Sequence, residues 1–306
     1  MKNLLVTGGY GFLGRNIALF FKNAGFYVTG IGRSSWKTDE YQSYGFSSWV
    51  DGEISFELLK SVEKIPDLII HCGGGGAVAF ADAYPFEDFR KSVLSTAAVL
   101  EYMRVVAPAA RLIYPSSPAV HGSLGKHPIQ PAAPFKPVST YGLHKKIAEE
   151  LCQNYRERFG LDISIIRFFS LFGNGLQKQL LWDACKKISS GEKHVEFWGT
   201  GEETRDFLHI SDAVSLLLKV GTCSQKNLII NGGSGTAHSV REILTLLAGL
   251  LKPGVEIRFN QQTRPGDPQH YHAAMSEALS LGWKPETSLE KGLKSYVNWY
   301  KQCIIK

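Results

Sequence analysis

The feature that most constrains this 306-residue chain is a run of glycines directly after its first apolar segment. Leu4, Leu5 and Val6 lead into Thr7-Gly8-Gly9-Tyr10-Gly11-Phe12-Leu13-Gly14, and a helical pattern follows from Arg15. A strand, a glycine turn and a helix start, in this order, make a cradle for phosphate groups. Gly8 allows the tight turn, Gly11 lets backbone approach a pyrophosphate, and Gly14 lets the helix pack closely. The spacing predicts a dinucleotide site formed by Gly8, Gly11, Phe12, Leu13 and Gly14.

Short apolar segments alternate with amphipathic ones over the first 170 residues. We expect strands at residues 27–31, 46–50, 67–71, 111–114, 161–168 and 228–231. We expect helices after the glycine turn, at residues 86–106, from Tyr141 onward, and at residues 240–251. This alternation implies a parallel sheet covered on both faces. The predicted fold is α/β, a Rossmann-type doubly wound parallel sheet with a smaller mixed α/β C-terminal lobe for substrate.

Composition is that of an ordinary globular protein, with 44% hydrophobic and 20% charged residues. The net charge of +6 includes no long basic run, so we expect no nucleic-acid partner. The five cysteines are scattered without a CxxC pair, which argues against a zinc site or a disulfide framework. A strand that starts near residue 3 leaves no room for a signal peptide, and no apolar run approaches the roughly 18 residues of a membrane span. We predict a cytoplasmic protein with no membrane partner.

The residues after the second strand bear on the choice of cofactor. They read Gly30-Ile31-Gly32-Arg33-Ser34. NAD enzymes commonly carry an acid here that binds the ribose hydroxyls, and that acid is absent. Arg33 with Ser34 would suit a 2′-phosphate, so NADP(H) is favoured while NAD(H) stays open. The alternative is that Arg33 is simply a solvated side chain.

The fourth strand runs into four consecutive glycines, Cys72-Gly73-Gly74-Gly75-Gly76. Glycines at the carboxyl end of a buried strand indicate a close approach of backbone to ligand. Gly73 is therefore a further candidate for cofactor binding.

One tyrosine of twelve, Tyr141, has a lysine four residues on, Lys145, at the start of a predicted helix. Residues i and i+4 of a helix share a face, so this spacing predicts an ammonium beside a phenol, a lowered phenol pKa and a general acid/base. Ser117, in Pro115-Ser116-Ser117-Pro118 at the end of the fifth strand, is placed to polarise the substrate oxygen that the tyrosine protonates. A serine that only caps a turn is the alternative.

Together these motifs resemble the extended short-chain dehydrogenase/reductase family, in particular its nucleotide-sugar epimerases, dehydratases and reductases. The resemblance rests on TGGYGFLG, SSPAVHG, YGLHK and RFF, and it continues through residues 199–209, 231–235, 264–268 and 281–285. It implies that Ser117, Tyr141 and Lys145 are catalytic, with Lys145 also binding the cofactor. It matches Glu53, or its neighbour Asp51, to the contact with adenine.

The same resemblance implies a nucleotide-diphosphate sugar as substrate and a homodimer as the assembly. Arg205 and Arg264 match arginines that hold the diphosphate, and Ser170 stands where the family has a substrate-binding asparagine. Residues 1–170, with about 205–235, then form the dinucleotide-binding domain. Residues 171–204 and 236–306 form the nucleotide-sugar-binding lobe.

Two departures from the family pattern narrow the reaction. Dehydratases carry Asp and Glu directly after the catalytic hydroxyl, and decarboxylases carry a Glu there, whereas this chain has Pro118 and Ala119. Without these carboxylates dehydration is disfavoured, and hydride transfer at the sugar C4 remains. Because Arg33 favours NADP(H), we expect reduction of a nucleotide-diphospho-4-keto-(6-deoxy)sugar with Tyr141 as general acid. The alternative is a 4-epimerase with tightly bound NAD.

Overall fold

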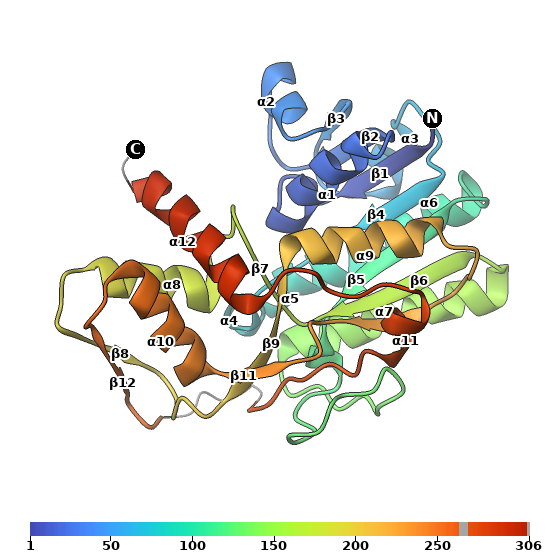
Figure 1. The fold of residues 1–306 in the computed structure, drawn as a ribbon. Coiled ribbons are helices and arrows are strands. Elements are labelled where there is room, and N and C mark those ends of the chain that lie inside the picture. Colours follow the sequence, from blue (N-terminus) through green and yellow to red (C-terminus); the bar gives the residue numbers. More distant parts are fainter. Residues whose placement is uncertain (263–268, 305–306) are drawn as a thin grey trace. The chain divides into compact units, whose positions relative to one another are not determined.

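The computed structural model describes residues 1–262 and 269–304. The chain divides into two compact units (Figure 1). The first unit comprises residues 1–122, 134–168 and 214–230, and the second comprises residues 123–133, 169–213 and 231–306. The assignment of a dinucleotide to one part of the chain and of a nucleotide sugar to the other stays a prediction.

A seven-stranded sheet forms the centre of the first unit, in the order β10-β6-β5-β4-β1-β2-β3. The pairings from β3 through β6 are all parallel. The order reverses between β1 and β4, which is the switch point at which doubly wound sheets bind ligands. The predicted fold class is therefore confirmed. The strands are β1 (Asn3–Thr7), β2 (Tyr27–Gly32), β3 (Ser48–Asp51), β4 (Leu68–His71), β5 (Arg111–Ser116), β6 (Asp162–Phe168) and β10 (Ile229–Gly232).

Helices cover both faces of this sheet because its strands alternate apolar side chains between the two faces. Leu5, Ile69 and Leu112 belong to one core cluster with α3 (Phe56–Lys60), α6 (Ser95–Val105) and α7 (Thr140–Phe159). Gly221, in α9 (Ile210–Thr222), lies against Leu68 and Ile113, where a Cβ would come within 2.8 Å of Leu68. The remaining helices of this unit are α1 (Phe12–Asn23), α2 (Thr38–Ser43), α4 (Val78–Ala83) and α5 (Pro85–Phe89).

The helix predicted at residues 86–106 is interrupted. It consists of α5, a π-helical turn over Arg90–Leu94, and α6. The hydroxyls of Ser95 and Thr96 donate to the carbonyls of Lys91 and Ser92 at this turn. Such side-chain bonds compete with the regular helical ladder, and π-helical turns are frequent at functional sites. Apolar periodicity alone could not indicate the interruption.

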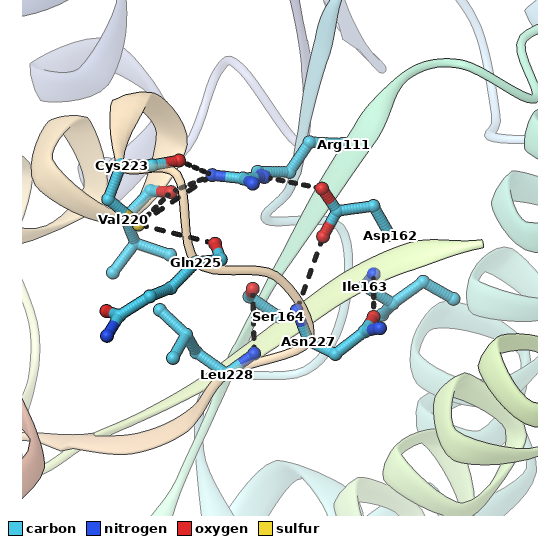
Figure 2. Close-up of polar contacts among 9 residues, drawn as sticks. All are labelled: Arg111, Asp162, Ile163, Ser164, Val220, Cys223, Gln225, Asn227 and Leu228. Carbon is cyan, nitrogen blue, oxygen red and sulfur yellow. Dashed lines mark hydrogen bonds and ion pairs between the residues drawn. The ribbon is translucent and has the colours of Figure 1, made fainter. Parts of the chain in front are cut away.

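The outer edge of the sheet is fixed by polar contacts between β5, β6 and the segment before β10 (Figure 2). Arg111 Nη1 donates to the carbonyls of Val220 and Cys223 at 2.7 and 2.8 Å, and its Nε donates to Asp162 at 2.9 Å. Asn227 Oδ1 accepts from the backbone N–H of Ile163 at 3.0 Å. These bonds set the register in which β10 joins β6, at the edge opposite β3.

The second unit contains two small sheets. β9 (Thr204–His209) pairs in parallel with β7 (Ser170–Phe172) and antiparallel with β11 (Ala237–Ser239), and β8 (His194–Phe197) pairs in parallel with β12 (Glu256–Phe259). α10 (Val240–Leu251) occupies the residues predicted for it and buries the apolar stripe of Ile243, Leu244 and Leu247. The other helices are α8 (Gln179–Ser189), α11 (Ser276–Ser280) and α12 (Leu289–Ile304).

Candidate active site

The glycine turn after β1 is packed so closely that two of its positions exclude any side chain. Gly8 has φ +67°, and a Cβ there would meet backbone atoms of Cys72 and Gly73 at 2.7–2.8 Å. A Cβ at Gly14 would meet the carbonyl oxygen of Gly8 at 2.6 Å. The turns after β1 and β4 therefore lie against each other, on either side of the switch point, with only backbone between them.

The N-terminus of α1 suits a pyrophosphate. Gly11 is its N-cap, and no side chain caps the first turn, which also carries no acidic residue. Gly11 N–H bonds the Gly8 carbonyl at 3.0 Å, and the helical ladder begins with Arg15 N–H bonding the Gly11 carbonyl. The N–H groups of Phe12 and Leu13 precede that ladder, where a bound anion is favoured by the free donors and by the helix dipole. The cradle thus fits the dinucleotide predicted for Gly8, Gly11, Phe12, Leu13 and Gly14.

Local capping brings Tyr141 to Ser117. Ser139 is the N-cap of α7, with its Oγ accepting from Gly142 N–H at 3.1 Å. Gly142 then packs on the turn after β5, where a Cβ would meet the Ala119 carbonyl oxygen at 2.5 Å. Ser117 caps this turn by accepting from Ala119 N–H at 3.2 Å, and its side chain also hydrogen-bonds Tyr141. Ser117 therefore both caps a turn and contacts the phenol.

The pKa of Tyr141 moves in the direction opposite to the sequence expectation. Burial raises the pKa of Tyr141 to about 12, the Ser117 hydrogen bond opposes this rise, and the charge of Asp88 adds to it. Lys145 Nζ donates instead to Tyr114 Oη at 3.3 Å and to the Pro115 carbonyl at 3.1 Å. The shared helix face was predicted correctly, but the lysine directs its ammonium into β5, so desolvation decides the pKa of the phenol.

A buried polar network that the sequence did not reveal connects Lys145 to the glycine turn. Tyr114 hydrogen-bonds Thr96, and Thr96 Oγ1 lies 3.1 Å from His71 Nε2. His71 Nδ1 lies 2.6 Å from Thr7 Oγ1, which accepts weakly from Gly73 N–H at 3.4 Å. Burial, with a smaller contribution from Lys145, lowers the pKa of His71 to about 3, so this imidazole is neutral at physiological pH. Gly73 is thereby tied to the turn after β1.

A carboxylate–imidazole pair lies beside Tyr141. His144 Nδ1 donates to Asp88 Oδ2 at 2.7 Å, and both side chains are buried. Asp88 Oδ1 is buried without a hydrogen-bond partner among the described residues. The charge of Asp88 acts on both Tyr141 and Lys145. His144 stands inside the YGLHK motif and could have been singled out from sequence, whereas nothing in the sequence indicated Asp88.

The edge formed by β2 and β3 carries the remaining cofactor candidates. Arg33 Nη1 lies 3.9 Å from Glu87 Oε1. Glu53 pairs with Arg90 at 2.8 Å, and Ser35 Oγ donates to Asp51 Oδ2 at 2.8 Å. The Ser34 carbonyl accepts from Trp49 Nε1 at 2.8 Å. Arg33, Ser34, Asp51 and Glu53 therefore lie at one edge of the first unit, and their contact with a cofactor stays a prediction.

The substrate-binding candidates belong to the second unit or lie outside the described residues. Ser170 begins β7, and Arg205 lies on β9, where its Nη1 donates to the Thr204 carbonyl at 2.8 Å. Arg264 falls in residues 263–268, outside the described part of the chain. The roles of these three residues stay predictions.

Comparison with known proteins identifies the family. Residues 4–232 match the model of the NAD dependent epimerase/dehydratase family. The chain belongs to this family. It is an enzyme of the extended short-chain dehydrogenase/reductase type, as the resemblance of its motifs predicted.

Members of this family resemble the chain over its whole length. UDP-glucuronate 4-epimerase from Thermodesulfobacterium geofontis is 28% identical over 331 residues, covering 99% of this chain and 98% of that protein. MoeE5, solved with UDP-glucuronic acid and NAD, is 25% identical with a TM-score of 0.86, covering 98% of this chain and 99% of its own. UDP-glucose 4-epimerase from Thermotoga maritima, solved with UDP-glucose, has a TM-score of 0.90 at 23% identity, covers 99% of each chain, and shows the shared fold.

The expectation of NADP(H) is wrong for this family member. MoeE5 and other solved neighbours are complexes with NAD. The physical reason is that carboxylates from distant parts of the sequence lie near Arg33. In the fold its guanidinium lies near Glu87, and carboxylates of Asp51 and Glu53 lie at the same edge of the sheet. A 2′-phosphate would meet these anions as well as the arginine.

No helix in the described part of the chain is both long enough and apolar enough to cross a membrane.

Proposed function

We propose that this protein is an NAD-dependent 4-epimerase of a UDP-sugar. The observation that carries the proposal is a set of groups for proton transfer at one carbon, without a carboxylate at the two positions after Ser117 where dehydratases carry Asp and Glu. Ser117 bonds Tyr141, Lys145 is buried next to them, and Pro118 and Ala119 follow the serine. The NAD complexes of solved neighbours and the 4-epimerase name of the 28% relative support the same activity.

The residues of the first unit would act in the following way. Gly8, Gly11 and Gly14 would hold the pyrophosphate of NAD, and Lys145 would hold its ribose hydroxyls. Bound NAD supplies a hydride acceptor, and then a hydride donor, at the sugar C4. The deprotonated form of Tyr141 takes the proton of the 4-hydroxyl while Ser117 bonds the same oxygen, and the protonated phenol that results returns this proton after the keto sugar has presented its other face. A phenol with a raised pKa favours this return, because it is most stable when protonated.

This proposal replaces reduction of a 4-keto sugar. The reductase was favoured only through the expected use of NADP(H), which the NAD-bound neighbours overturn. An epimerase regenerates its cofactor in every turnover and has no need to exchange it. In this proposal the first unit binds NAD, and the second binds the UDP-sugar through Ser170, Arg205 and Arg264.

The proposal is tested with purified protein and no added cofactor. UDP-glucose and UDP-glucuronic acid are incubated separately, and the 4-epimeric products are quantified by chromatography. We expect interconversion of one of these pairs, with NAD released on denaturation of the protein. Consumption of NADPH with a UDP-4-keto-6-deoxy sugar, without any epimerisation, would contradict the proposal.

Tyr141→Phe is the corresponding active-site variant. Removing the acid/base hydroxyl should lower kcat by about 10²–10⁴-fold, with little change in NAD content. Tyr155→Phe is a matched control on the same helix, because Tyr155 Oη bonds Glu101 at 3.2 Å, away from Ser117. If Tyr141→Phe and Tyr155→Phe turn over at similar rates, Tyr141 is not the acid/base.

A further inference from the structure

The structure provides a replacement for the ribose-binding acid that β2 lacks. Nucleotide-binding sheets that use NAD commonly place a carboxylate at the end of β2, where it accepts a hydrogen bond from the ribose 2′-hydroxyl. In this chain β2 ends on Gly32, which has no side chain, and Arg33 follows. A protein that binds NAD with this sequence needs its acceptor from another element.

The register between β2 and β3 supplies one. The two strands are parallel, and Gly32 is paired with Asp51, the last residue of β3. Neighbouring strands lie about 4.8 Å apart, so Asp51 carries its carboxylate to the edge at which β2 ends. Gly52 N–H also bonds the Gly32 carbonyl at 3.1 Å, which holds the two strand ends together. Because Gly32 has no side chain, the Trp49 ring packs against it, where a Cβ would lie 2.9 Å from the ring, and a ligand would reach Asp51 past this ring.

The carboxylate of Asp51 is oriented but keeps acceptor capacity. Ser35 Oγ donates to its Oδ2 at 2.8 Å. Its Oδ1 has no hydrogen bond with any residue in the described ranges, and the side chain is exposed. A carboxylate has about four lone-pair sites. Asp51 can therefore accept a ribose hydroxyl without giving up the bond from Ser35.

An aromatic cluster fixes the segment that presents Ser35. Trp36 stacks on Tyr44 with ring centroids 5.1 Å apart and an interplanar angle of 13°. Its centroid is 4.7 Å from those of Tyr10 and Trp49. Tyr10 belongs to the glycine turn and Trp49 to β3. Through these ring contacts, Trp36 holds the segment after β2 against both the glycine turn and β3. Stacking of this kind stabilises the segment beyond the effect of area burial.

The arginine at this edge is a weaker determinant than the acid. Arg33 has 58% of its side chain exposed, and its pair with Glu87 spans 3.9 Å. Exposed ion pairs of this kind contribute little to stability, so Glu87 does not fix Arg33 strongly. A 2′-phosphate at Asp51 would bring about two negative charges against a carboxylate, which Arg33 would only partly offset.

We propose that Asp51 binds the 2′-hydroxyl of the adenosine ribose from β3, in place of the acid absent from β2, and that it excludes a 2′-phosphate. This inference rests on the proposed use of NAD. It assigns Asp51 to the ribose and leaves Glu53 for the adenine. It also explains how a chain whose β2 ends on Gly32, followed by Arg33 and Ser34, selects NAD.

The test measures binding rather than turnover. Wild type and Asp51→Asn are titrated with NAD, with the NAD analogue that lacks the adenosine 2′-hydroxyl, and with NADP, each displacing NADH whose fluorescence is followed. A hydrogen bond to a carboxylate corresponds to about a tenfold to hundredfold change in affinity. Wild type should prefer NAD over the 2′-deoxy analogue by about that factor and should bind NADP poorly. Asp51→Asn should bind NAD and the analogue equally, and its relative affinity for NADP should rise.

Two further variants keep the test specific. Asp39→Asn changes an exposed carboxylate on α2 in the same chemical way and should leave all three affinities unchanged. Ser35→Ala removes the hydroxyl that orients Asp51 and should reduce, without abolishing, the preference for the 2′-hydroxyl. If Asp51→Asn retains the full preference for NAD over its 2′-deoxy analogue, the inference is overturned while the epimerase proposal stands. If wild type binds no NAD, both fail.

Discussion

Two buried carboxylates, one in each unit, are held in opposite ways. Asp206, on β9 of the second unit, accepts hydrogen bonds from Ser234 N–H and Oγ at 2.6 and 2.7 Å, from Gly235 N–H at 3.0 Å and from Ala273 N–H at 3.1 Å. Asp88, on α5 of the first unit, accepts from His144 at 2.7 Å, and its second oxygen is buried without a partner among the described residues.

The difference in hydrogen bonding separates a carboxylate that stabilises the fold from one that changes the pKa values of neighbouring groups. Asp206 satisfies backbone donors from two segments far apart in sequence and so fixes them to β9. Within the described part of the chain, Asp88 accepts a hydrogen bond from His144 alone. Part of its negative charge therefore stays uncompensated near the titratable side chains of Tyr141 and Lys145. That charge raises the pKa of Tyr141 and also raises the pKa of Lys145, whose own burial lowers it. We infer that Asp206 matters mainly for stability and Asp88 mainly for the acid/base properties of the site.

The largest expected effect on stability is that of Asp206→Asn. An amide in place of the carboxylate turns an NH₂ group toward N–H donors and leaves at least one of them without an acceptor. We expect the free energy of unfolding to fall by about 3 kcal/mol, measured by urea denaturation. Asp183→Asn, at an exposed position of α8, is the matched control and should change it by less than about 0.5 kcal/mol. Equal stability of the two variants would remove the structural role assigned to Asp206.

Asp88→Asn should instead change the pH dependence of catalysis. The amide oxygen can still accept from His144, so we expect a loss of stability of no more than about 1 kcal/mol. Loss of the negative charge lowers the pKa of Tyr141 and that of Lys145. The ascending limb of kcat/KM against pH, which reports the deprotonated tyrosine acting as base, should therefore move to lower pH, by about one unit.

The charged and titratable groups that face Tyr141 define what this measurement reports. They are Asp88 on α5, whose charge acts on Tyr141, and Tyr114 on β5, while Ser117 at the end of β5 hydrogen-bonds the phenol. Lys146→Gln, an exposed charge change on the same helix as Tyr141, should leave the limb in place. A limb that stays in place in Asp88→Asn, together with a stability loss as large as that of Asp206→Asn, would mean that both carboxylates are structural.

The sequence predicted what local patterns determine. The alternation of strands and helices in the first unit, the limits of α10, and the placing of Tyr141 and Lys145 on one helix follow from periodicity and short-range spacing. Each depends on residues that are close together in the chain or that end neighbouring parallel strands.

Contacts between elements distant in sequence could not be predicted in this way. His144 and Asp88 are separated by 56 positions, and the pairing of Gly32 with Asp51 depends on the register of two strands. The direction of the Lys145 ammonium depends on Tyr114 and Pro115, which the i+4 rule does not include. The prediction of NADP(H) was wrong for the same reason, because it used Gly32 and Arg33 without the residues that lie beside them.

A third variant, Gly75→Ala, tests how rigidly Asp88 is held. A Cβ at position 75 would overlap Asp88 Oδ1, which is buried and therefore has little room to withdraw. The new methyl group should push the carboxylate away from His144 and cost about 1–2 kcal/mol of stability. Gly249→Ala in α10 is the matched control, because its Cβ would meet no atom within 4 Å, and a helical alanine should raise stability by up to about 1 kcal/mol. Thermal unfolding of the two variants should therefore show shifts of opposite sign. If Gly75→Ala unfolds at the wild-type temperature and keeps the wild-type pH profile of activity, the Asp88 side chain moves freely. Asp88 and Asp206 would then differ in mobility rather than in their effect on neighbouring pKa values.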